Sequence, residues 1–536
     1  LQRALPLQWV GKVGFNLELF PEHFLGKTWF TESKSGIFPR QANGPVKLNS
    51  NSIATPIPIC SGRRITLAPE DRFSHVQIES QNSEISLYDG RIPDNNGWFV
   101  LRSLVPTGAT ENAIVWDIRP NVVDNWRRQP QILHSQVGYH PEQLKQALLE
   151  LDLRDQRRDR AQLLRIFPDG DTEVVHNDTP KRWGSFLRYD YQIFDFTRVT
   201  TPGSYKIRYR NHESQPFRID RGIFKHNVWQ PTLETFLPVQ MCHMEVRDRF
   251  RIWHGLCHMD DALQAPPGTE HFDGYRQAAA TETRYKAYEH IPGLTSGGWH
   301  DAGDYDIATG SQATTVSTLS MVYETFDVRT DQTTVLPDEH YVELFKPDGK
   351  IDILQQIEHG VRFLLAPYRI SGHSYVGVIS PTIQQYVHLG DASTMTDNKV
   401  YDGSRDALPS PEHRRGKMDD RWAFTNRDSG LEYQVAATLA AASRALSEHD
   451  PSLADDCLEQ AQKIWDYENN HKSVRHRAAY VPGNLQVQKI LATIELFKTT
   501  GQDKYKTLLL RLTPDIQENI AQVGWAVVQI FDDLNN

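Results

Sequence analysis

The spacing of apolar residues changes once along this chain, near Gly222, and the change separates two kinds of structure. Before it, short apolar segments such as residues 76–79 and 98–101 are separated by turn clusters such as residues 93–97, a pattern typical of β-sandwiches. After it, apolar residues recur at intervals of nearly four, which predicts helices. A chain of 536 residues is too long for one hydrophobic core, so several domains are expected.

We therefore predict a β-sandwich-like domain over residues 1–125, a second β-sandwich over residues 131–221 and an all-α domain over residues 222–536. The first domain carries no recognisable chemistry, and we favour a packing platform over a sugar-binding module. In the third domain we interpret the apolar stripes as core packing of antiparallel helices. These stripes cover residues 312–326 and 351–365, Ala436 to Ala442, Ile490 to Phe497, and Ile520 to Ile530.

Composition argues against nucleic-acid binding and against a membrane-spanning segment. The net charge is −10, and no basic block offers the charge that a nucleic-acid backbone requires. No apolar run is long enough to span a bilayer. The chain opens at Leu1 without a leader, which a cleaved signal peptide or a trimmed sequence would explain. We expect a secreted or periplasmic protein.

Residues 296–305 read Ser-Gly-Gly-Trp-His-Asp-Ala-Gly-Asp-Tyr and combine two carboxylates with aromatic rings. Glycoside hydrolysis needs a carboxylate to activate water and an acid to protonate the leaving oxygen, while flat rings suit the apolar faces of sugars. Asp301 and Asp304 have the spacing to share the first task, and Trp299 and Tyr305 to contact substrate. The alternative is that Asp301 caps a helix and Asp304 lies in its first turn.

The same stretch resembles the Gly-Trp-x-Asp-Ala-Gly-Asp signature of glycoside hydrolase family 9, the inverting cellulases and their relatives. The resemblance implies that Asp304 is the catalytic base and that Asp301 helps it hold the water. It also implies an (α/α)6 barrel of twelve helices and a β-1,4-glucan or related plant polysaccharide as substrate.

A second resemblance covers residues 132–141, Ile-Leu-His-Ser-Gln-Val-Gly-Tyr-His-Pro. They are similar to the Asn-Gln-Val-Gly-Tyr-x-Pro opening of the immunoglobulin-like domain that precedes many family 9 catalytic domains, with Ser135 in place of the asparagine. Residues 202–207 and 214–219 then read as a turn and two closing strands. The second β-sandwich is therefore expected to be this immunoglobulin-like domain.

Cys242, Cys257, His258 and His300 supply two thiolates and two imidazoles, which complete a closed tetrahedral zinc shell. Their arrangement resembles the Cys…Cys-His…His zinc site of cellulases that carry an immunoglobulin-like domain. We predict one structural Zn²⁺, against the alternative of free buried thiols and hydrogen-bonded histidines.

Two runs farther along combine carboxylates with aromatic rings, at residues 386–391 and 397–402. Such a loop is able to line a cleft or to bind Ca²⁺ through oxygen ligands. We favour a hydrogen-bonded surface loop and keep calcium as an open possibility.

The sequence also departs from the family. Asp306 and Ile307 replace the small or basic residue and the lysine that commonly follow the signature, which puts the substrate in doubt. The glutamate that serves as general acid is not legible, and Glu518 reads as a surface residue. Only about eight helices can be placed, so we predict an incomplete barrel that further polypeptide of the same protein completes, delivering the acid.

The function that these patterns favour is inverting hydrolysis of a β-1,4-glucan by an endoglucanase-like glycoside hydrolase. The alternatives are a non-catalytic carbohydrate-binding relative and an exo-acting β-glycosidase on oligosaccharides. A zinc-dependent hydrolase is disfavoured, because four protein ligands leave zinc no open position.

Overall fold

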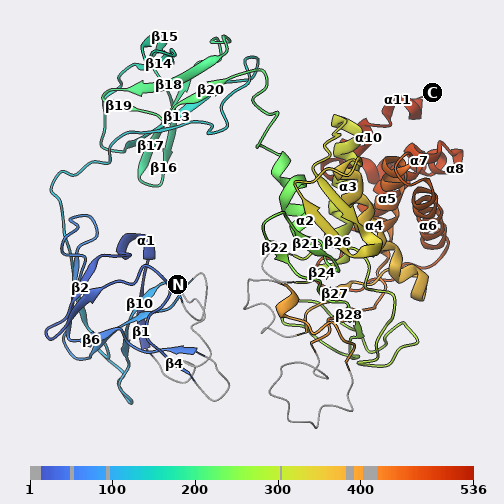
Figure 1. Cartoon of the computed structure of the whole chain (residues 1–536), viewed down its shortest axis with the longest axis horizontal. Helices are drawn as coiled ribbons and strands as arrows, with labels where there is room; N and C mark the ends of the chain where they lie inside the picture. Colours follow the sequence, from blue (N-terminus) through green and yellow to red (C-terminus); the bar gives the residue numbers. More distant parts are fainter. Residues whose placement is uncertain are drawn as a thin grey trace. The chain divides into compact units, whose positions relative to one another are not determined.

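The computed structural model describes residues 14–48, 54–91, 97–301, 305–381, 392–401 and 419–535 (Figure 1). Contacts divide the chain into two compact units. The first contains residues 1–134, 144–199 and 205–216, and the second contains residues 135–143, 200–204 and 217–536. Strands dominate the first unit, and long helices dominate the second, as the change of period predicts.

The N-terminal part of the first unit is built from two antiparallel sheets around one apolar core. One sheet has the order β1 (Gly14–Leu19), β10 (Phe99–Leu104), β9 (Ile85–Asp89) and β6 (Cys60–Gly62). The other has the order β11 (Trp116–Pro120), β8 (Val76–Ser80), β7 (Arg64–Leu67), β2 (Thr28–Phe30) and β3 (Ser35–Ile37). A short helix α1 (Pro21–Phe24) and the strand pair β4 (Val46–Leu48) and β5 (Ala54–Pro56) accompany them. The predicted strands at residues 76–79 and 98–101 are confirmed as β8 and β10, within a residue or so at their starts.

Residues 131–219 also contain two sheets, and alternate side chains are buried along residues 147–151, 190–194 and 205–209. The first has the order β12 (Gln131–Leu133), β13 (Gln146–Asp152), β17 (Tyr189–Asp195) and β16 (Lys181–Phe186). The second has the order β15 (Thr172–Asp178), β14 (Ala161–Ile166), β18 (Gly203–Tyr209) and β19 (His212–Glu213), and β20 (Phe217–Ile219) also pairs with β18. The two closing strands expected from the sequence correspond to β18 and β20.

The second unit is organised around α5 (Ser429–Leu446), which contacts α3, α4, α6 and α7. Asp428 caps its amino terminus, where its side chain accepts hydrogen bonds from two backbone N–H groups. The alanines along it are buried, and such small side chains let neighbouring helices approach closely. The remaining helices are α2 (Leu237–Gln240), α3 (Thr309–Phe326), α4 (Asp352–Ser371), α6 (Pro451–Asn470), α7 (Leu485–Thr500), α8 (Asp503–Arg511), α9 (Thr513–Glu518), α10 (Ile520–Val528) and α11 (Phe531–Asn535).

The all-α prediction for residues 222–536 needs a correction, because this region also contains two small sheets. One has the order β22 (Ile252–His254), β21 (Glu245–Arg247), β26 (Tyr341–Leu344) and β25 (Thr333–Leu336). The other has the order β23 (Leu263–Gln264), β28 (Trp422–Phe424), β27 (Gly377–Ile379) and β24 (Ile307–Ala308). Strands of two to four residues are too short for alternation to reveal them in the sequence.

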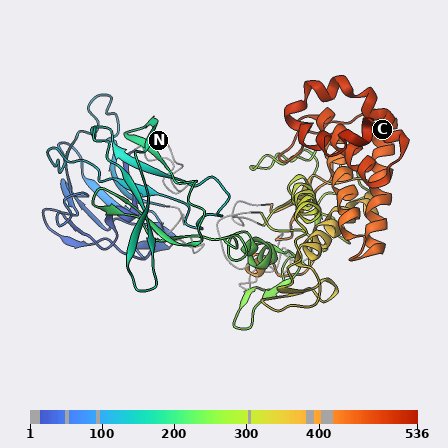
Figure 2. The ribbon, with the colours of Figure 1, turned by 90° about the horizontal axis from the view of Figure 1, so that it is seen from above.

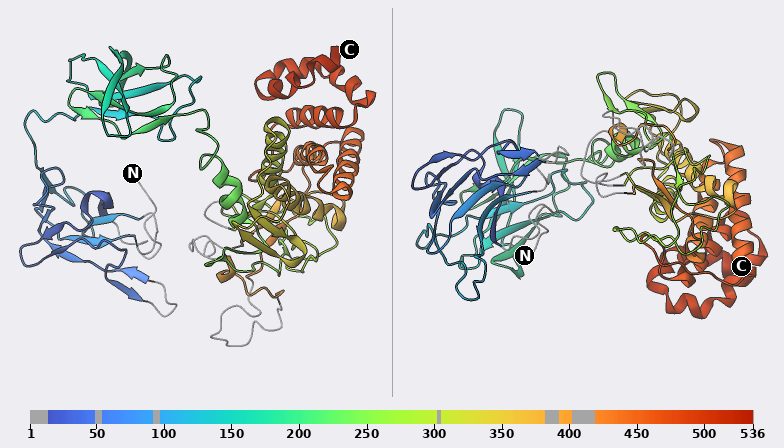
Figure 3. Two further views of the ribbon diagram at one scale, coloured as in Figure 1. Left: turned by 45° about the horizontal axis from the view of Figure 1, so that its top comes forward. Right: turned by 90° about the horizontal axis from the view of Figure 1, so that it is seen from below.

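Within this unit the small sheets and their loops lie at one end of the long helices, and the last helices lie at the other (Figure 3). Seen from above, α8 to α11 form a red arc beside the helices that surround α5 (Figure 2). Strand β24 of one small sheet is followed directly by α3, so α3 begins at the end of the helices where the sheets lie. Among the helices in the described ranges, none is both long and apolar enough to cross a bilayer.

Close packing of α3 against α4 generates the first prediction. A Cβ added at Gly360 in α4 would lie 2.2 Å from Val316 Cγ2 and 2.6 Å from the Trp299 ring. We expect Gly360→Ala to destabilise the second unit by about 1–3 kcal/mol, because a packed core resists an added carbon. Gly524→Ala in α10 is the matched control, since its nearest neighbour would be 3.4 Å away.

The midpoint of thermal unfolding, followed by circular dichroism, distinguishes the two variants. Gly524→Ala should be neutral or slightly stabilising, because alanine favours a helix over glycine by up to about 1 kcal/mol. Equal midpoints for both variants would show that α4 has room at Gly360.

Candidate functional site

The turn that carries the aspartate signature is tied by its backbone to the segment before Cys242. Met241 and Trp299 form an antiparallel bridge. The Cys242 N–H donates to the Gly298 carbonyl at 2.9 Å, and the His300 N–H donates to the Gln240 carbonyl at 2.9 Å. The signature turn and the first cysteine ligand therefore share one short ladder of hydrogen bonds.

Two glycines allow this turn to lie directly against α4. Gly297 has a φ of +71°, and a Cβ there would lie 2.1 Å from the His359 carbonyl oxygen. Gly298 has a φ of +83°, and its carbonyl lies 2.8 Å from Nε2 of the buried His359 ring. Glycine is thus favoured at both positions because the backbone is left-handed there, and at Gly297 also because a side chain would collide with α4.

Trp299 and Tyr305 lie in the core. Trp299 is 4 % exposed, and its indole N–H donates to Gln356 Oε1 at 2.9 Å. Tyr305 is 7 % exposed, and its ring contacts the rings of His258 and His300. Side chains so buried have no face left for a sugar, so the substrate-binding role expected of them is not carried further.

Asp301 is half-buried, and its backbone N–H donates to the Asp306 carbonyl at 3.0 Å. Asp301 does not cap α3, because α3 begins at Thr309 and its N-cap residue is Ala308. Asp304 falls in residues 302–304, outside the described residues. Its role as base therefore stays a prediction.

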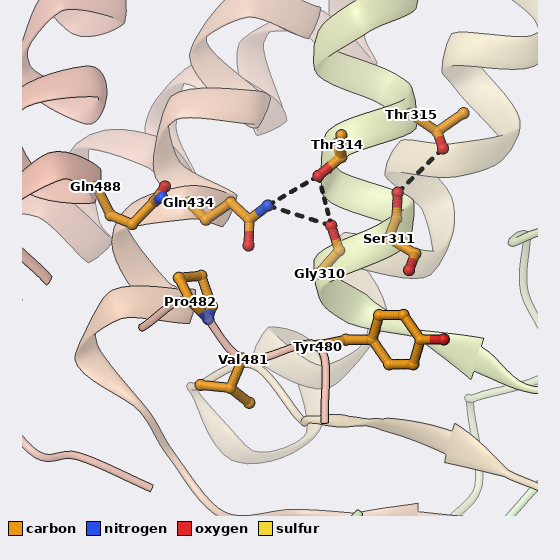
Figure 4. Close-up of a pocket in the computed structure, with 9 residues that line it drawn as sticks. All are labelled: Gly310, Ser311, Thr314, Thr315, Gln434, Tyr480, Val481, Pro482 and Gln488. Atoms are coloured by element: carbon orange, nitrogen blue, oxygen red, sulfur yellow. Dashed lines mark hydrogen bonds between the residues drawn. The ribbon is translucent and has the colours of Figure 1, made fainter. Parts of the chain in front are cut away.

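A pocket of about 510 Å³ opens beside the first turn of α3 (Figure 4). Gly310 and Ser311 form one wall, Gln434 of α5 another, and Tyr480 with the two residues after it a third. The Gln434 side-chain amide donates to the Gly310 carbonyl at 3.1 Å and to Thr314 Oγ1 at 3.0 Å, which fixes the first wall against the second. The described residues that line it are Gly310, Ser311, Thr314, Thr315, Gln434, Tyr480, Val481, Pro482 and Gln488.

Tyr275 links this pocket to the aspartates. Its ring stacks on that of Tyr480, with ring centroids 5.8 Å apart. Burial raises the pKa of the Tyr275 hydroxyl, and the negative charges of Asp306 and Asp301 raise it further. Tyr275 thus contacts a wall of the pocket and lies within electrostatic reach of Asp306 and Asp301.

Cys242, Cys257, His258 and His300 converge as the sequence predicts. One potential ligand atom of each lies within 4.8 Å of the others, and all four residues are buried. The two sulfurs are 3.9 Å apart, too far for a disulfide. Cys242 Sγ lies 3.7 Å from His258 Nδ1, and Cys257 Sγ lies 3.6 Å from His300 Nε2. A tetrahedral zinc shell requires about 3.8 Å between sulfurs and about 3.6 Å between sulfur and nitrogen, so these residues fit the metal.

The surroundings of the cluster set the protonation states of two of its side chains. Burial raises the pKa of the Cys242 thiol, but the hydrogen bond with Cys257 and the charge of Arg421 outweigh burial and lower it well below its ordinary value. Burial and the charge of Arg421 lower the pKa of His258 to about 4. Cys242 is thus poised as a thiolate and His258 as a neutral imidazole, the states that bind zinc.

Arg421 is fully buried and connects the two halves of the site. It forms an ion pair with Asp261, donates to Cys242 Sγ at 3.1 Å, and donates to the Tyr305 carbonyl. Asp261 also accepts from His243 Nε2 at 2.9 Å. The guanidinium therefore holds a cysteine ligand and the end of the signature turn together.

The structure describes only part of the two runs, residues 386–391 and 397–402, for which calcium was kept as a possibility. Residues 386–391 and Asp402 lie outside the described residues, whereas Asp397 lies beside Asp260 and Asp419. The half-buried Asp397 is thus part of a group of carboxylates rather than of an isolated surface loop.

Comparison with known families covers both units. The profile described as glycosyl hydrolase family 9 matches residues 235–531, more than half of the chain. The chain belongs to glycosyl hydrolase family 9. The profile described as the cellulase N-terminal ig-like domain matches residues 127–214, which confirms the immunoglobulin-like prediction for this part of the family 9 chain.

Known relatives of the family 9 chain are cellulases by name. Endoglucanase A of Fibrobacter succinogenes is 26% identical over 40% of this chain and 46% of its own. Endoglucanase D of Acetivibrio thermocellus is 20% identical over 81% of this chain and 60% of its own. The structure of a metagenome-derived family 9 endoglucanase matches with a TM-score of 0.51 at 22% identity, over 72% of this chain and 64% of its own. The chain thus spans about half the length of the curated relatives it matches.

Sequence reasoning missed Arg421 and the walls of the pocket. Arg421 follows Asp419 and Asp420 in a run that reads as a polar loop, and nothing in that run marks a buried ion pair. Tyr480 and Gln434 lie far from the signature in sequence, so only the fold brings them to the first turn of α3. In the sequence, the pair of glycines at 297 and 298 indicates that the backbone of the signature turn packs closely against another segment.

The buried ion pair generates the second prediction. We expect Arg421→Met to destabilise the family 9 domain by about 3–5 kcal/mol, because Asp261 would keep a buried charge without its partner. Arg369→Met is the matched control, since Arg369 and Asp456 form an ion pair in which both side chains are more than half exposed. Such a pair is worth about 0–1 kcal/mol.

Thermal unfolding of both variants measures the difference. The midpoint for Arg421→Met should fall by about 5 °C or more, and that for Arg369→Met should stay near that of the unmodified chain. A small effect at Arg421 would mean that Asp261 is neutral in the folded chain.

Proposed function

We propose that this chain carries the base side of an inverting glycoside hydrolase that acts, as an endoglucanase does, on β-1,4-glucan or a related plant polysaccharide. Membership of family 9 supports the reaction, and the names of its relatives support the substrate class. The observation that carries the proposal is the signature turn: backbone hydrogen bonds hold it from behind, and eight residues after Asp301 the chain enters α3, whose first turn lines the pocket.

In the proposed reaction Asp304 removes a proton from the attacking water, and Asp301 helps to orient that water. The general acid protonates the leaving oxygen on the opposite face of the sugar, so the anomeric centre inverts. The lining of the pocket suits a sugar chain, because Ser311, Gln434 and Gln488 offer hydrogen bonds and Tyr480 offers an aromatic ring. The walls are fixed by their own hydrogen bonds, which favours a preformed site.

We further propose that the general acid comes from polypeptide outside the described residues, as expected of a barrel completed by a further segment. Among the described residues that line the pocket, none is an aspartate or a glutamate. Glu324 and Glu495 line a groove of about 300 Å³ along α3, α5, α7 and α10, but both are bound to Arg444. Glu324 lies about 21 Å along α3 from Gly310, well beyond the roughly 6.5–9.5 Å that separates the carboxyl groups of an inverting site.

Exposed apolar side chains support the same proposal. Met321 is 40% exposed, Trp525 50%, and Val528 75%. Met321 and Trp525 line the groove, where an additional helix would cover them. A non-catalytic carbohydrate-binding relative is the alternative function, because the described lining of the pocket lacks an acid.

The third prediction tests the base. Asp304→Asn in the protein expressed from its whole reading frame should lose on the order of a hundredfold or more in the release of reducing ends from β-glucans, because the variant cannot accept a proton from water. Asp301→Asn should also lose activity. Asp455→Asn, on the exposed face of α6, is the control and should hydrolyse normally.

Nuclear magnetic resonance of the first product identifies the anomer and so tests inversion. Turnover of Asp304→Asn at the unmodified rate would refute the assignment of the base. Glucan binding without hydrolysis by the unmodified protein would instead favour the carbohydrate-binding alternative.

We propose that Cys242, Cys257, His258 and His300 hold one structural zinc ion. The distances between their ligand atoms support this, and a complete shell of four protein ligands leaves no position for water or substrate. When bound, zinc would crosslink the segments that carry the ligands. Because His300 adjoins Asp301, the crosslink would also position the signature turn.

The fourth prediction tests zinc. Elemental analysis should find about one zinc ion per chain purified without chelators, and almost none in Cys257→Ser. Cys457→Ser is the matched control, because Cys457 is equally buried but lies in α6, outside the cluster. Cys257→Ser should also unfold at a lower temperature. Equal zinc contents in the two variants would exclude this cluster.

The remaining expectations concern organisation and location. We propose domain limits of 1–125, 131–221 and 222–536, which the separate cores over residues 19–101 and 233–530 support. We also propose that the protein is secreted or periplasmic, because a polymeric glucan lies outside the cell that degrades it.

A further inference from the structure

A second group of potential metal ligands lies close in sequence to the zinc cluster but contains only carboxylates. One oxygen each of Asp260, Asp397 and Asp419 lies within 4.8 Å of the others. Asp420 is fully buried next to Asp419. The four residues come from three segments: the loop after His258, residues 392–401, and the residues before β28. The fold therefore gathers negative charge that is dispersed in the sequence.

Each of three carboxylates has one oxygen that is satisfied and one that is not. Asp260 Oδ2 accepts from Thr396 Oγ1 at 2.7 Å, Asp397 Oδ1 accepts from the Lys399 N–H at 2.8 Å, and Asp420 Oδ2 accepts from the Tyr401 N–H at 2.9 Å. The second oxygens, Asp260 Oδ1, Asp397 Oδ2 and Asp420 Oδ1, are buried and accept no hydrogen bond. A buried carboxylate oxygen without a donor is unfavourable unless something else binds it.

Among the residues that the structure describes, no basic side chain fills this role. Arg421 adjoins Asp420, but its guanidinium is directed to Asp261, Cys242 Sγ and the Tyr305 carbonyl. In the part of the chain that the structure describes, no lysine or arginine forms an ion pair with Asp260, Asp397 or Asp420. Asp260 and Asp420 are both 0 % exposed, so solvent does not offset their charge either.

The chemistry of the group selects a hard cation. Zinc prefers nitrogen and sulfur ligands, whereas calcium and magnesium take oxygen. Ligand oxygens about 2.3–2.6 Å from calcium span up to about 5 Å, and those about 2.1 Å from magnesium span about 4 Å. Calcium accepts six to eight oxygens in a flexible geometry, whereas magnesium demands a near-ideal octahedron, so carboxylates that come from three separate segments suit calcium. We propose that Asp260, Asp397 and Asp419, with Asp420 beside them, bind a structural calcium ion.

This site would fasten residues 392–401 to the loop that supplies two zinc ligands. Asn398 already bridges the two segments: its Oδ1 accepts from the Met259 N–H at 3.0 Å, and its Nδ2 donates to the Leu256 carbonyl at 3.0 Å. Cys257 and His258 lie between those contacts. A calcium ion would attract the carboxylates of both segments and so add a second link between them. This link would stabilise the loop that contains Cys257 and His258.

The test uses the whole 536-residue chain, freed of calcium by dialysis against resin-treated buffer, with zinc content measured in every sample. Titration calorimetry with CaCl2 should find one site per chain, and MgCl2 should bind at least about tenfold more weakly. Calcium should also raise the midpoint of thermal unfolding.

Asp397→Asn is the main variant, because Asp397 is only half-buried and its amide is able to keep the local hydrogen bonds. Its calcium affinity should fall at least about tenfold with an unchanged zinc content. Asp419→Asn should behave alike. Without calcium, both should unfold at or above the temperature of the unmodified chain, because each removes one of several crowded negative charges. Asp455→Asn is the control and should bind normally.

Two results would overturn the proposal. One is that the unmodified chain takes up no calcium at about 10 mM, a concentration above the range of weak protein sites; the carboxylates would then share protons instead. The other is calcium binding of unchanged affinity in both Asp397→Asn and Asp419→Asn, which would place the ion elsewhere.

Discussion

The buried ion pair of Arg421 and Asp261 is the interaction on which the second unit's functional end depends. One guanidinium contacts the Asp261 carboxylate, the Cys242 sulfur and a backbone carbonyl at the end of the signature turn. An arginine is suited to this task because its rigid fork presents several donors at once and stays charged when buried. Such a pair gives little net stability, but it imposes one arrangement on the groups around it.

This arrangement explains why the small sheets matter to an otherwise helical domain. Arg421 directly precedes β28, and Asp261 lies just before β23, with which β28 pairs in parallel. The pairing brings the two charges together, and β24 on the far edge of the same sheet leads into α3. The sheet is therefore the frame that relates the metal-binding loop, the aspartate turn and the pocket wall to one another.

Much of this organisation could be predicted from the sequence, and the predictions that failed did so for identifiable physical reasons. Long helices are recognisable from the period of their apolar residues, so helices were expected where α3, α4, α5 and α7 are found, although α5 and α7 extend beyond the predicted stripes at both ends. The group of Cys242, Cys257, His258 and His300 was expected because its order resembles the Cys…Cys-His…His site of related cellulases. Trp299 was misinterpreted, because an aromatic ring beside a carboxylate looks the same in sequence whether it packs against a glycine on a helix or faces a sugar. The carboxylates Asp260 and Asp419 gave no sign of meeting, because 158 other residues separate them in the printed sequence.

The parallel pairing of β23 with β28 also has a consequence for how the chain folds. Arg421 and Asp261 are 160 positions apart, and closing a loop of that length costs about 4–5 kcal/mol of chain entropy beyond a constant. Helices α3 and α4 lie inside this loop and form from local contacts, so they are expected to fold before it closes. Until closure, Asp261 remains hydrated and Cys242 lacks its guanidinium. The order of assembly thus runs from helices to sheet to buried charge, and the functional end of the unit is completed last.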